Sequence, residues 1–398
     1  MYLITGNKSE CCGCTACQQI CGHNAIEMKA DSEGFVFPVK DVSACVNCGL
    51  CEKVCSFSSP VYKNETLRVF AAMAKDSTER SKSSSGGLFY VIAKKIIEQG
   101  GVVYGAIMDK DMQVRHADAS TIDELQNLRG SKYVQSALCD TFKTIRAKLR
   151  AGKLVYFTGT GCQVAGLKSF LMKDYDNLIT SDLVCHGVPN QHLFDEHIKY
   201  LERRHKGKVV DYRFRDNENW GVCESVTIIA DSQNSKTYRL PTFSLSPYLY
   251  SFMYSMTYRM SCYECPFAKI PRQGDITLAD YWGVKKYFPN LDISRGVSLI
   301  LANNNKGKSF LDELKSELIF EESNINDATK ENRNLTANTS MPEIRKTIFK
   351  KIHDEGYEKV AKTIFRPQKY YKILLMAKLR EMVGMDNYLK LRKLIKRF

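Results

Sequence analysis

The chain contains two runs of closely spaced cysteines that share one spacing, C-x2-C-x2-C-x3-C. The first run holds Cys11, Cys14, Cys17 and Cys21, and the second holds Cys45, Cys48, Cys51 and Cys55. Such a run places three thiolates around one tight loop and a fourth outside it, which is how proteins hold a 4Fe-4S cluster. In modules with two runs, the fourth cysteine crosses over to the other cluster. We therefore predict one cluster on Cys11, Cys14, Cys17 and Cys55, and another on Cys45, Cys48, Cys51 and Cys21.

Disulfides and zinc are the alternatives for these thiols. A disulfide framework is disfavoured because the fifteen cysteines are odd in number and thiols two residues apart would close small, strained rings. Structural zinc usually draws two ligands from each of two separated knuckles rather than three from one loop. Iron-sulfur binding is therefore the favoured interpretation. Cys12 falls outside the spacing and is predicted to bind no cluster.

Residues 1–60 resemble a bacterial two-cluster ferredoxin. Between the two runs, "AIEMKADSEGFVFPV" predicts two short strands joined by a hairpin turn at "DSEG". The proline that commonly follows the fourth cysteine is replaced by Gly22 and Ser56 in this sequence. The resemblance implies a small α+β domain that binds two 4Fe-4S clusters.

The bulk composition indicates a soluble globular protein. The 398 residues, 44% of them hydrophobic and 26% charged, suffice for two or three domains with a sizeable core. The amino end lacks a basic segment followed by a long apolar one, and no apolar run reaches the length needed to cross a bilayer. We therefore expect a cytoplasmic location, where a reducing environment disfavours disulfides.

The net charge of +14 is concentrated in one part of the chain. Residues 345–398 contain sixteen Lys and Arg against five Asp and Glu, whereas the first 66 residues contain five basic and seven acidic side chains. The positive charge thus belongs to the carboxyl-terminal tail. Because only this tail is basic and no groove-reading motif occurs, nucleic-acid binding is not predicted.

From Val69 to Asn303 the chain alternates strand-like runs such as "KLVYFTG" with helix-like runs such as "LFYVIAKKIIEQ". Such alternation predicts an α/β domain. The expected organisation is a ferredoxin-like domain at 1–60, an α/β domain at 68–320, a polar linker at 321–344 and a basic helical tail at 345–398.

Two joints in the α/β domain have features of an anion site. "SSSGG" at Ser83 to Gly87 precedes a predicted helix, and "GTGC" at Gly159 to Cys162 follows a predicted strand and opens another helix. Hydroxyls, glycine amides and the positive end of a helix would converge there, as a phosphate requires. Neither joint is a Walker loop or a complete dinucleotide fingerprint, and an ordinary helix cap is the favoured interpretation of each taken alone.

Four further cysteines occur where ligands collect in α/β proteins. Cys162 and Cys185 follow strand-like runs, and Cys262 and Cys265 form a C-x2-C pair. Meeting at the carboxyl edge of a sheet, these four thiols would hold a third cluster or a zinc ion. A scattered core position, the alternative, suits Cys139 and Cys223 better. Another alternative is that Cys162 is a nucleophile paired with His186. In that case the clusters on the eight cysteines of the two amino-terminal runs would have no role in electron transfer.

The ordered motifs "SSSGGLF", "GSKYVQS", "GTGCQVAGLKSFL", "DLVCHGVP" and "CYECPFA…GDITLADYWG" resemble the beta-subunit family of coenzyme F-420 hydrogenases and dehydrogenases over residues 68–320. The resemblance implies an FAD-binding domain that also holds a 4Fe-4S cluster on Cys162, Cys185, Cys262 and Cys265. One departure is Gly161, where relatives often have proline. The residues implied to line the FAD are Ser84, Ser85, Gly86, Gly87, Gly130, Ser131, Lys132, Tyr133, Gln135, Ser136, Thr160 and Gln163.

The cofactors imply the class of reaction. A flavin exchanges electrons in pairs as a hydride or singly, whereas a 4Fe-4S cluster handles one at a time. The expected function is an iron-sulfur flavoprotein oxidoreductase that passes electrons between a small organic molecule, such as reduced deazaflavin, and a one-electron carrier such as ferredoxin or another redox protein. The alternative is a non-catalytic electron-transfer subunit. Lys132 would neutralise a flavin phosphate or a reduced ring, or else face solvent.

Two segments of the tail, "YYKILLMAKLREMV" and "YLKLRKLIKRF", place apolar residues at roughly helical spacing among Lys and Arg. Helices of this kind lie on anionic membrane surfaces as peripheral anchors or dock acidic protein partners. A basic helix packed on its own domain is an equally good interpretation.

Overall fold

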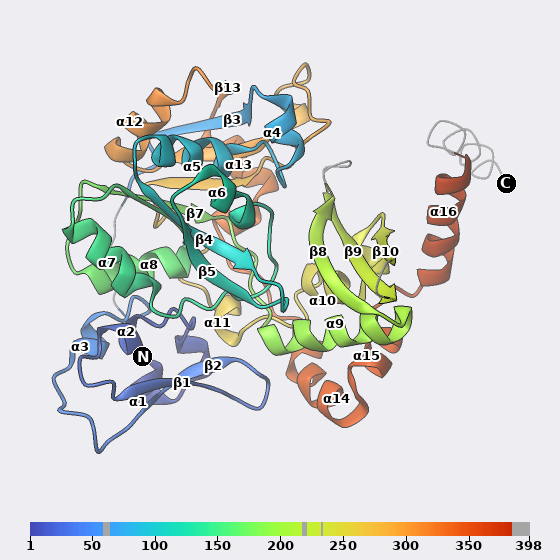
Figure 1. Cartoon of the computed structure of the whole chain (residues 1–398), viewed down its shortest axis with the longest axis horizontal. Coiled ribbons are helices and arrows are strands. Elements are labelled where there is room, and N and C mark those ends of the chain that lie inside the picture. The colour runs from blue at the N-terminus through green and yellow to red at the C-terminus, as the bar shows by residue number, and fades with distance from the viewer. Residues whose placement is uncertain (59–63, 217–220, 232–233, 384–398) are drawn as a thin grey trace.

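The computed structural model describes residues 1–58, 64–216, 221–231 and 234–383. These residues form a mixed α/β protein with three parts, which Figure 1 shows side by side. A small amino-terminal module lies below a domain built on an eight-stranded sheet, and a second lobe with a three-stranded sheet lies beside both. The alternation of strand-like and helix-like runs in the sequence predicts the α/β domain but does not predict the separate second lobe.

The amino-terminal module consists of short elements around a β-hairpin. Its elements are α1 (Tyr2–Thr5), a 3₁₀ turn (Lys8–Glu10), α2 (Ala16–Ile20), β1 (Ile26–Ala30), β2 (Val36–Lys40) and α3 (Leu50–Lys53). β1 and β2 pair antiparallel, and Asp31 Oδ1 closes their turn by accepting hydrogen bonds from the amides of Glu33 and Phe35. Thr15 and Gly49, which precede the two cysteine-bearing helices, have left-handed backbones with φ of 61° and 72°. The chain thus turns sharply inside each cysteine run.

The eight-stranded sheet has the order β13-β3-β12-β11-β7-β6-β4-β5. Its strands are β3 (Arg68–Ala74), β4 (Val102–Met108), β5 (Val114–Ala119), β6 (Val155–Thr160), β7 (Leu178–Leu183), β11 (Ile276–Asp280), β12 (Ser298–Ala302) and β13 (Leu318–Ser323). β4, β6, β7 and β11 run parallel, and the outer strands pair antiparallel. Neighbouring residues Tyr156 and Phe157 are both fully buried, each on a different face, so apolar side chains cover both sides of the central strands.

Helices cover both faces of this sheet. One face packs against α5 (Leu88–Glu98), α6 (Ile122–Leu128) and α12 (Asn305–Glu313). The other packs against α7 (Thr141–Arg150), α8 (Gly161–Leu171) and α13 (Ile325–Glu331). A short helix, α4 (Ser77–Ser81), and a 3₁₀ turn (Val284–Lys286) lie in the connecting loops. The result is a three-layer arrangement.

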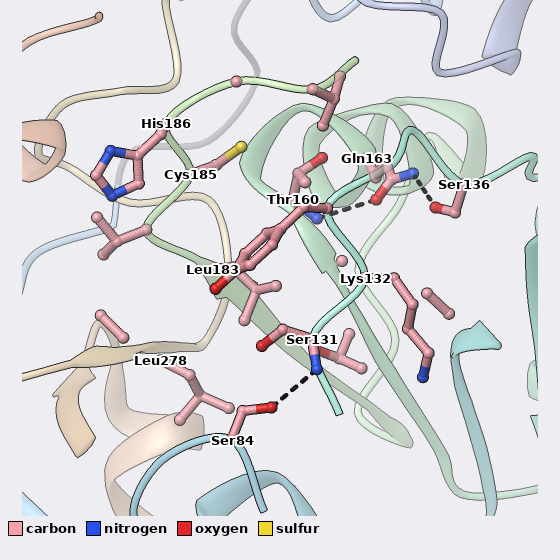
Figure 2. Close-up of a pocket in the computed structure, with 18 of the residues that line it drawn as sticks. Ser84, Ser131, Lys132, Ser136, Thr160, Gln163, Leu183, Cys185, His186 and Leu278 are labelled. Carbon is pink, nitrogen blue, oxygen red and sulfur yellow. Dashed lines mark hydrogen bonds between the residues drawn. The ribbon is translucent and has the colours of Figure 1, made fainter. Parts of the chain in front are cut away.

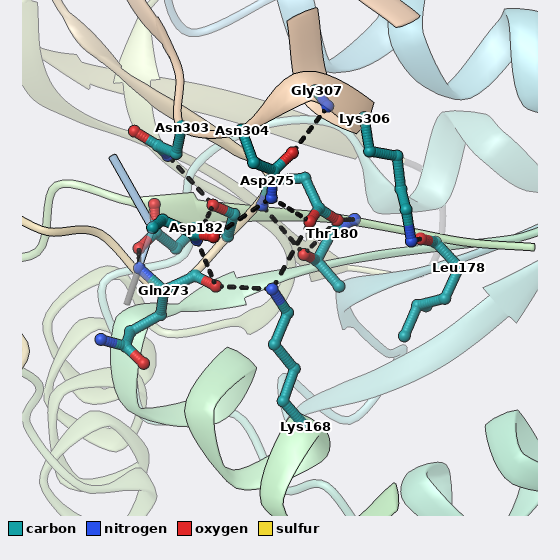
Figure 3. Close-up of polar contacts among 12 residues, drawn as sticks. Lys168, Leu178, Thr180, Asp182, Gln273, Asp275, Asn303, Asn304, Lys306 and Gly307 are labelled. Atoms are coloured by element: carbon teal, nitrogen blue, oxygen red, sulfur yellow. Dashed lines mark hydrogen bonds and ion pairs between the residues drawn. The ribbon is translucent and has the colours of Figure 1, made fainter. Parts of the chain in front are cut away.

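A buried polar network fixes how β7, β11 and α8 lie against one another (Figure 3). Asp275, just before β11, accepts hydrogen bonds from the amide and hydroxyl of Thr180 in β7, at 2.8 and 2.7 Å. Lys168 of α8 donates to the carbonyl of Gln273 at 2.8 Å, and its ammonium lies 3.5 Å from Asp275 Oδ1. Burial alone would raise the pKa of Asp275, but Lys168 and these hydrogen bonds hold it below its usual value.

The second lobe is inserted between β7 and β11. It consists of α9 (Gln191–His205), β8 (Lys208–Asp216), β9 (Gly221–Asp231), β10 (Asn234–Leu240), a 3₁₀ turn (Phe243–Leu245), α10 (Pro247–Met253) and α11 (Met260–Tyr263). At its centre Glu224 Oε2 lies 2.7 Å from His197 Nε2 and accepts a hydrogen bond from the Tyr212 hydroxyl at 2.7 Å. Tyr357 contacts His197 Nδ1 at 3.0 Å, so one polar cluster joins strand, helix and carboxyl-terminal segment.

Residues 321–344 differ from the expected polar linker. They contain the end of β13, α13 and two 3₁₀ turns (Arg333–Leu335 and Glu343–Lys346). Asparagine side chains order this segment by forming hydrogen bonds with the backbone. Asn324 Oδ1 caps α13 by accepting from the amide of Asp327, and Asn332 Nδ2 donates to the carbonyl of Ala328. Such local bonds order a polar segment without a large core.

The basic tail is divided between a packed part and a projecting helix. α14 (Ile348–Glu355) and α15 (Tyr357–Thr363) bury Ile348 and Val360 in the core of the second lobe, and Phe365 just after α15 is buried there too. α16 (Tyr370–Val383) projects from the lobe in Figure 1 and exposes Leu375. The second basic segment, "YLKLRKLIKRF", lies outside the described residues. Within the described part of the chain, no helix combines the length and apolar character that a bilayer span requires.

The amino-terminal module shares a core with the sheet domain. Ala16, Ile20 and Val54 pack into the same apolar cluster as α7 and α8. Gln19 Oε1 accepts hydrogen bonds from the amides of Phe142 and Lys143 at 2.8 and 3.2 Å. These amides belong to the first turn of α7 and have no partner within the helix. The module is therefore an integral part of the molecule's packing.

Arg345 ties the hairpin of this module to the carboxyl-terminal segment. Its guanidinium binds the Glu33 carboxylate through two bonds of 3.0 and 2.6 Å, and its Nε donates to the carbonyl of Tyr258. The Arg345 side chain is 2% exposed and that of Glu33 is 25% exposed.

We expect Arg345→Ala to lower the free energy of unfolding by about 2 kcal/mol, because it leaves a half-buried carboxylate without its partner. Urea denaturation of anaerobically prepared protein, followed by circular dichroism, measures this change. The control is Lys346→Ala, which removes an exposed pair with Glu343 and should change stability by less than about 0.5 kcal/mol. Equal stability of the two variants would contradict a stabilising role for Arg345.

Candidate functional site

A cavity of about 430 Å³ lies at the carboxyl ends of the parallel strands. Thr160, the last residue of β6, pairs with Leu183, the last residue of β7, and Leu183 pairs with Leu278 of β11. β6 and β7 end at this line and β11 ends two residues beyond it, at Asp280, so the segments that follow the three strands leave the sheet at the same edge. Figure 2 shows Thr160, Leu183, Cys185 and Leu278 around the resulting cavity.

The structure brings most of the predicted FAD-binding residues to this cavity. Those that line it are Ser84, Ser85, Gly87, Gly130, Ser131, Lys132, Tyr133, Gln135, Ser136, Thr160 and Gln163. Gly86 does not line it. A Cβ on Gly86 would lie 2.5 Å from the carbonyl oxygen of Ala72 and 2.8 Å from the amide of Ser298, so this glycine allows the serine loop to pack closely on the sheet.

The serine loop (Ser83 to Gly87) is attached to the predicted FAD-binding loop around Ser131 and to the sheet. Ser84 Oγ accepts a hydrogen bond from the amide of Ser131 at 2.9 Å, as Figure 2 shows. The hydroxyl of Ser85 donates to the carbonyl of Val297, and that of Ser83 to the carbonyl of Glu79. Gly87, with φ of 87°, then allows α5 to begin at the cavity wall. This wall therefore presents the amino end of α5, which is one of the features that an anion site requires.

Lys132 is held by backbone carbonyls. Its ammonium donates to the carbonyl oxygens of Asn127 and Arg129 at 3.3 and 2.8 Å, which lie at the carboxyl end of α6. Burial lowers the pKa of Lys132 to about 7. Its contacts in the described structure thus correspond to a helix carboxyl cap, a role that the sequence alone did not indicate.

A chain of hydrogen bonds runs along one side of the cavity. The amide of Thr160 donates to Gln163 Oε1, and Gln163 Nε2 donates to Ser136 Oγ, each at 3.0 Å. Ser136 Oγ lies 3.0 Å from His116 Nδ1, and His116 Nε2 lies 3.1 Å from the carbonyl of Thr158. Since a carbonyl only accepts, Nε2 carries the proton and Nδ1 accepts from the serine. Burial lowers the pKa of His116 to about 4.

At the far side of the cavity a buried cation faces aromatic rings. Arg215 NH1 donates to Asp280 Oδ2 at 2.7 Å and to the Tyr133 hydroxyl at 3.2 Å, and its guanidinium lies 5.9 Å from the Trp282 ring. Sequence reasoning missed both Arg215 and His116. They lie on separate strands without a recognisable motif, so only the tertiary structure places them at the cavity.

The four cysteines of the α/β domain come together at this cavity. Burial raises the pKa of Cys185 to about 12, and the nearby thiols of Cys162 and Cys265 add to the shift. Burial also raises the pKa of Cys262 well above its usual value, with further contributions from Cys185, Cys265 and Cys162. The four thiols are thus close enough to affect one another's charge.

The structure also groups cysteines of the amino-terminal module. Burial raises the pKa of Cys17 well above its usual value, and the charges of Cys14, Cys11 and Cys55 raise it further. These four are the set predicted to share one cluster.

The second predicted set is less buried. Burial raises the pKa of Cys51, and Cys45 contributes. Cys48 is exposed, and Cys21 Sγ accepts from the amide of Ala25 at 3.3 Å.

Among the residues that the structure describes, no three His, Cys, Asp or Glu side chains converge as ligands of a single metal ion. A 4Fe-4S cluster is bound through a different cysteine at each iron, so its ligands surround a volume and do not meet at one point.

Cys12 lies between the two groups of thiols. Hydrogen bonds with Cys14 and Cys162, together with burial, raise the pKa of Cys12 well above its usual value. The same contact with Cys12 lowers the pKa of Cys162 to about 7 and also lowers that of Cys14. Cys12 lines both the large cavity and a small one of about 30 Å³ bordered by Cys11, Cys14, Cys17 and Cys55. The sequence, which placed Cys12 outside the spacing, did not indicate this position.

Fold and site together define a mixed α/β domain with a cavity and grouped thiols at its strand ends. Residues 152–328, somewhat under half of the chain, match the family that comprises the carboxyl-terminal part of the beta subunit of coenzyme F420 hydrogenase/dehydrogenase. This segment, which contains Cys162, Cys185, Cys262 and Cys265, is therefore similar to that domain. The match does not extend to the amino-terminal module, so its likeness to ferredoxin stays a prediction.

Other comparisons add little. No curated protein sequence matches the chain. A similar solved chain comes from a xenon-derivatised F420-reducing [NiFe] hydrogenase complex of Methanosarcina barkeri, with 14% identity, a TM-score of 0.39, and coverage of 82% of this chain and 96% of that one.

His116 makes stability depend on pH. Its pKa falls from 6.5 to about 4 on folding, so the unfolded chain binds the proton more readily. The stabilisation is complete above pH 6.5 and is lost as the pH falls towards 4. His116→Asn should therefore reduce the loss of stability between pH 7 and pH 5 by about 2 kcal/mol.

Urea denaturation of wild type and variant at the two pH values measures this difference. His353→Asn, at a histidine whose side chain is 85% exposed, is the control and should leave the pH dependence unchanged. An identical loss of stability in wild type and His116→Asn would show that His116 does not titrate as stated.

Proposed function

We propose that this protein is an FAD-dependent iron-sulfur oxidoreductase. It would pass electrons between a small organic hydride donor or acceptor, such as reduced deazaflavin, and one-electron carriers. A bound flavin would supply two-electron chemistry and the 4Fe-4S clusters one-electron chemistry. The observation that carries the proposal is that Cys162, Cys185, Cys262 and Cys265 line the same cavity as the residues predicted to bind FAD.

The cavity fits a flavin in size and chemistry. Its volume of about 430 Å³ is within the range of roughly 300–1,000 Å³ usual for cofactor sites. Apolar side chains such as Leu183 and Leu278 form much of its wall (Figure 2), with polar groups at defined positions. Arg215 lines this cavity. Its Nε is buried and has no hydrogen-bond partner among the described residues. The serine loop and the loop around Ser131 would hold the phosphates, and Arg215 and Tyr133 would bind polar groups of the ring or substrate.

Arg259 supports iron-sulfur loading of the amino-terminal module. Its fully buried guanidinium donates to the carbonyls of Cys11 and Val36 and lies 3.6 Å from Cys11 Sγ. No carboxylate pairs with it in the described part of the chain. A buried cation without a counter-charge is costly, and thiolates that hold a cluster on Cys11, Cys14, Cys17 and Cys55 would supply that charge.

The cysteines of the α/β domain (Cys162, Cys185, Cys262 and Cys265) also have a cation nearby, Arg272. Burial raises the pKa of Cys265 to about 11, and the Arg272 guanidinium opposes this shift. Arg272 also pairs with Asp182 at 3.2 Å, so it contributes less net charge than Arg259. N–H donors and cations beside ligating sulfurs are among the factors that set cluster potentials.

The second cysteine run is where external carriers would exchange electrons with the protein. Cys48 is exposed, and the neighbouring side chains of Val42 and Val46 are 79% and 57% exposed. Contiguous exposed apolar patches mark protein interaction sites, and Val42 and Val46 lie close in sequence to the ligand run. A ferredoxin or another redox protein would therefore dock here and exchange electrons with the cluster on Cys45, Cys48, Cys51 and Cys21.

A non-catalytic electron-transfer subunit is the second candidate function. It is supported by the matched family, whose description is that of a beta subunit. Anaerobic purification of the lone chain separates the two. Turnover with reduced deazaflavin or ferredoxin would establish an enzyme, whereas redox-active cofactors without turnover would establish a subunit.

A cysteine-nucleophile transferase has less support. The pKa of Cys162, about 7, results first from its hydrogen bond with Cys12. No hydrogen bond joins Cys162 to His186 in the described structure, and burial lowers the pKa of His186. The groups around Cys162 thus favour a cluster ligand over a nucleophile.

Cys162→Ala should lower the iron content from about twelve to about eight atoms per chain, because one of three 4Fe-4S clusters loses a ligand. Iron, acid-labile sulfide and flavin are quantified on anaerobically purified protein. Cys139→Ala, at an exposed cysteine outside the groups, should retain the wild-type content. Lost activity with unchanged iron and flavin would indicate a nucleophile, and wild-type protein without iron or flavin would refute the proposal.

Val46→Glu should raise the apparent KM for the external one-electron carrier about fivefold, because it adds a charge to the docking patch. The rate at which the organic donor reduces the protein, followed by stopped-flow absorbance, should stay the same. Val210→Glu places the same charge on exposed β8 of the second lobe and serves as the control. If both variants raise KM equally, the carrier docks elsewhere.

A further inference from the structure

One segment of the cavity wall pairs with β5 through its backbone. The amide of His116 donates to the carbonyl of Ala137 at 2.8 Å, and the amide of Ala137 donates to the carbonyl of Val114 at 3.0 Å. This parallel pairing sets Ser136, which lines the cavity, beside the imidazole of His116. Backbone hydrogen bonds therefore fix the position of the two side chains relative to each other.

The His116 ring is buried, and both of its nitrogens have partners. It is 4% exposed and stacks on Phe157 with ring centroids 5.3 Å apart. β4 and β6 pair only as far as Tyr104 and Phe157, and the next carbonyl of β6, that of Thr158, lies 3.1 Å from His116 Nε2. A carbonyl only accepts, so Nε2 carries the proton of the neutral ring, and Nδ1 accepts from Ser136 Oγ at 3.0 Å.

Gln163 fixes the same hydroxyl from the other side. The backbone amide of Thr160 donates to Gln163 Oε1 at 3.0 Å, which identifies this atom as the oxygen of the side-chain amide. Nε2 therefore faces Ser136 Oγ and donates to it, also at 3.0 Å (Figure 2). A serine hydroxyl has one proton and two lone pairs. The proton goes to His116 and one lone pair to Gln163, so Ser136 can only accept a hydrogen bond from a molecule in the cavity.

This acceptor lies at the end of the cavity where a thiol is found. Gln163 follows Cys162 in the first turn of α8, and Thr160 Oγ1 lies 3.1 Å from Cys162 Sγ. The loop around Ser131, which would hold phosphates, lies towards the bottom of Figure 2, whereas Ser136 lies towards its top. Electron exchange with a cluster on the grouped thiols would place the ring of a flavin near them, and thus near Ser136.

We propose that His116 is a positioning residue that holds the Ser136 hydroxyl as a hydrogen-bond acceptor towards the cavity, so that Ser136 binds a reduced flavin in preference to an oxidised one. The reacting ring nitrogen of a flavin is an acceptor when oxidised and carries a proton when reduced. An oxygen that only accepts bonds the second form and faces a lone pair of the first. Neither His116 nor Ser136 gives up a proton or an electron. This inference rests on the proposed function, in which the cavity binds FAD.

Two other roles for His116 are less compatible with its contacts. A general acid or base needs a nitrogen that faces the reacting molecule, whereas both nitrogens of His116 are bonded to Thr158 and Ser136. A histidine that only stabilises the fold is the second alternative. It predicts that substitutions change stability but leave the flavin potential unchanged.

The test measures the flavin midpoint potential of Ser136→Ala and His116→Phe in the full-length, anaerobically purified protein. Phenylalanine can keep the stacking on Phe157 but cannot accept from Ser136, whose hydroxyl is then free to donate into the cavity. Each variant should lower the preference for reduced over oxidised flavin about tenfold, which corresponds to a potential about 30 mV lower for a two-electron couple. Spectroelectrochemical titration measures the potential, and flavin released on denaturation measures the content.

His116→Asn is the conservative variant. Its side-chain oxygen can accept from Ser136, so most of the wild-type potential should be retained. His205→Phe is the matched control, because His205 also packs on an aromatic ring, that of Tyr238 in the second lobe, with centroids 4.0 Å apart. Its flavin potential should equal that of wild type.

A wild-type potential in Ser136→Ala or in folded His116→Phe would overturn the proposal, as would a potential that rises. If His116→Phe does not fold, Ser136→Ala decides. Loss of flavin from Ser136→Ala, with an unchanged potential in the fraction that remains, would mean that Ser136 binds both redox states equally and would also overturn it. Wild-type protein that contains no flavin would instead refute the proposed function on which this inference rests.

Discussion

The alignment of three parallel strand ends is the constraint on which the site depends. β6, β7 and β11 are in a register that sets Thr160, Leu183 and Leu278 at one line. Cys162, Cys185 and Asp280 each follow this line by two residues. A slip of one residue would turn each strand's side chains to the opposite face and separate these groups. The network around Asp275 and Lys168, buried beneath the strand ends, prevents such a slip because every partner would lose its hydrogen bond.

The second feature that matters is the shared core of the amino-terminal module and α8. Ala16, Ile20 and Val54 are buried against the helices that cover the sheet, so the two cysteine sets cannot move independently. Short loops with left-handed residues at Thr15 and Gly49 hold the thiols near this interface. Such a fixed spacing is what the proposed electron transfer between the sets would require, since its rate depends on distance. A flexible linker between separate domains would not provide it.

The sequence predicted the parts of the site that depend on local pattern. Cysteine spacing predicted that Cys11, Cys14, Cys17 and Cys55 form a group, and the structure places their thiols near one another. Strand and helix alternation predicted the α/β domain with Cys162 at a strand-to-helix joint. The order of residues 321–344 was not predicted, because it depends on asparagine side chains that bond groups three to five residues away and leave no apolar periodicity. A different limit applies to His116, Arg215 and Cys12, whose positions arise from contacts between segments far apart in the chain.

Arg259 would couple folding to the proposed iron-sulfur loading of the amino-terminal module. Its guanidinium is fully buried, lies 4.2 Å from the centre of the Phe37 ring, and joins the cysteine loop to the hairpin and to Gln135. Carbonyls and an aromatic face offset only part of the cost of removing this charge from water. Thiolates of the first cysteine run offset more of it when they are deprotonated, and metal binding is what keeps thiols deprotonated near neutral pH. The ligands therefore stabilise the cation, and the cation holds the loop that Cys11, Cys12 and Cys14 share. Under the proposed loading, the interface with α8 would be complete only when this charge is balanced.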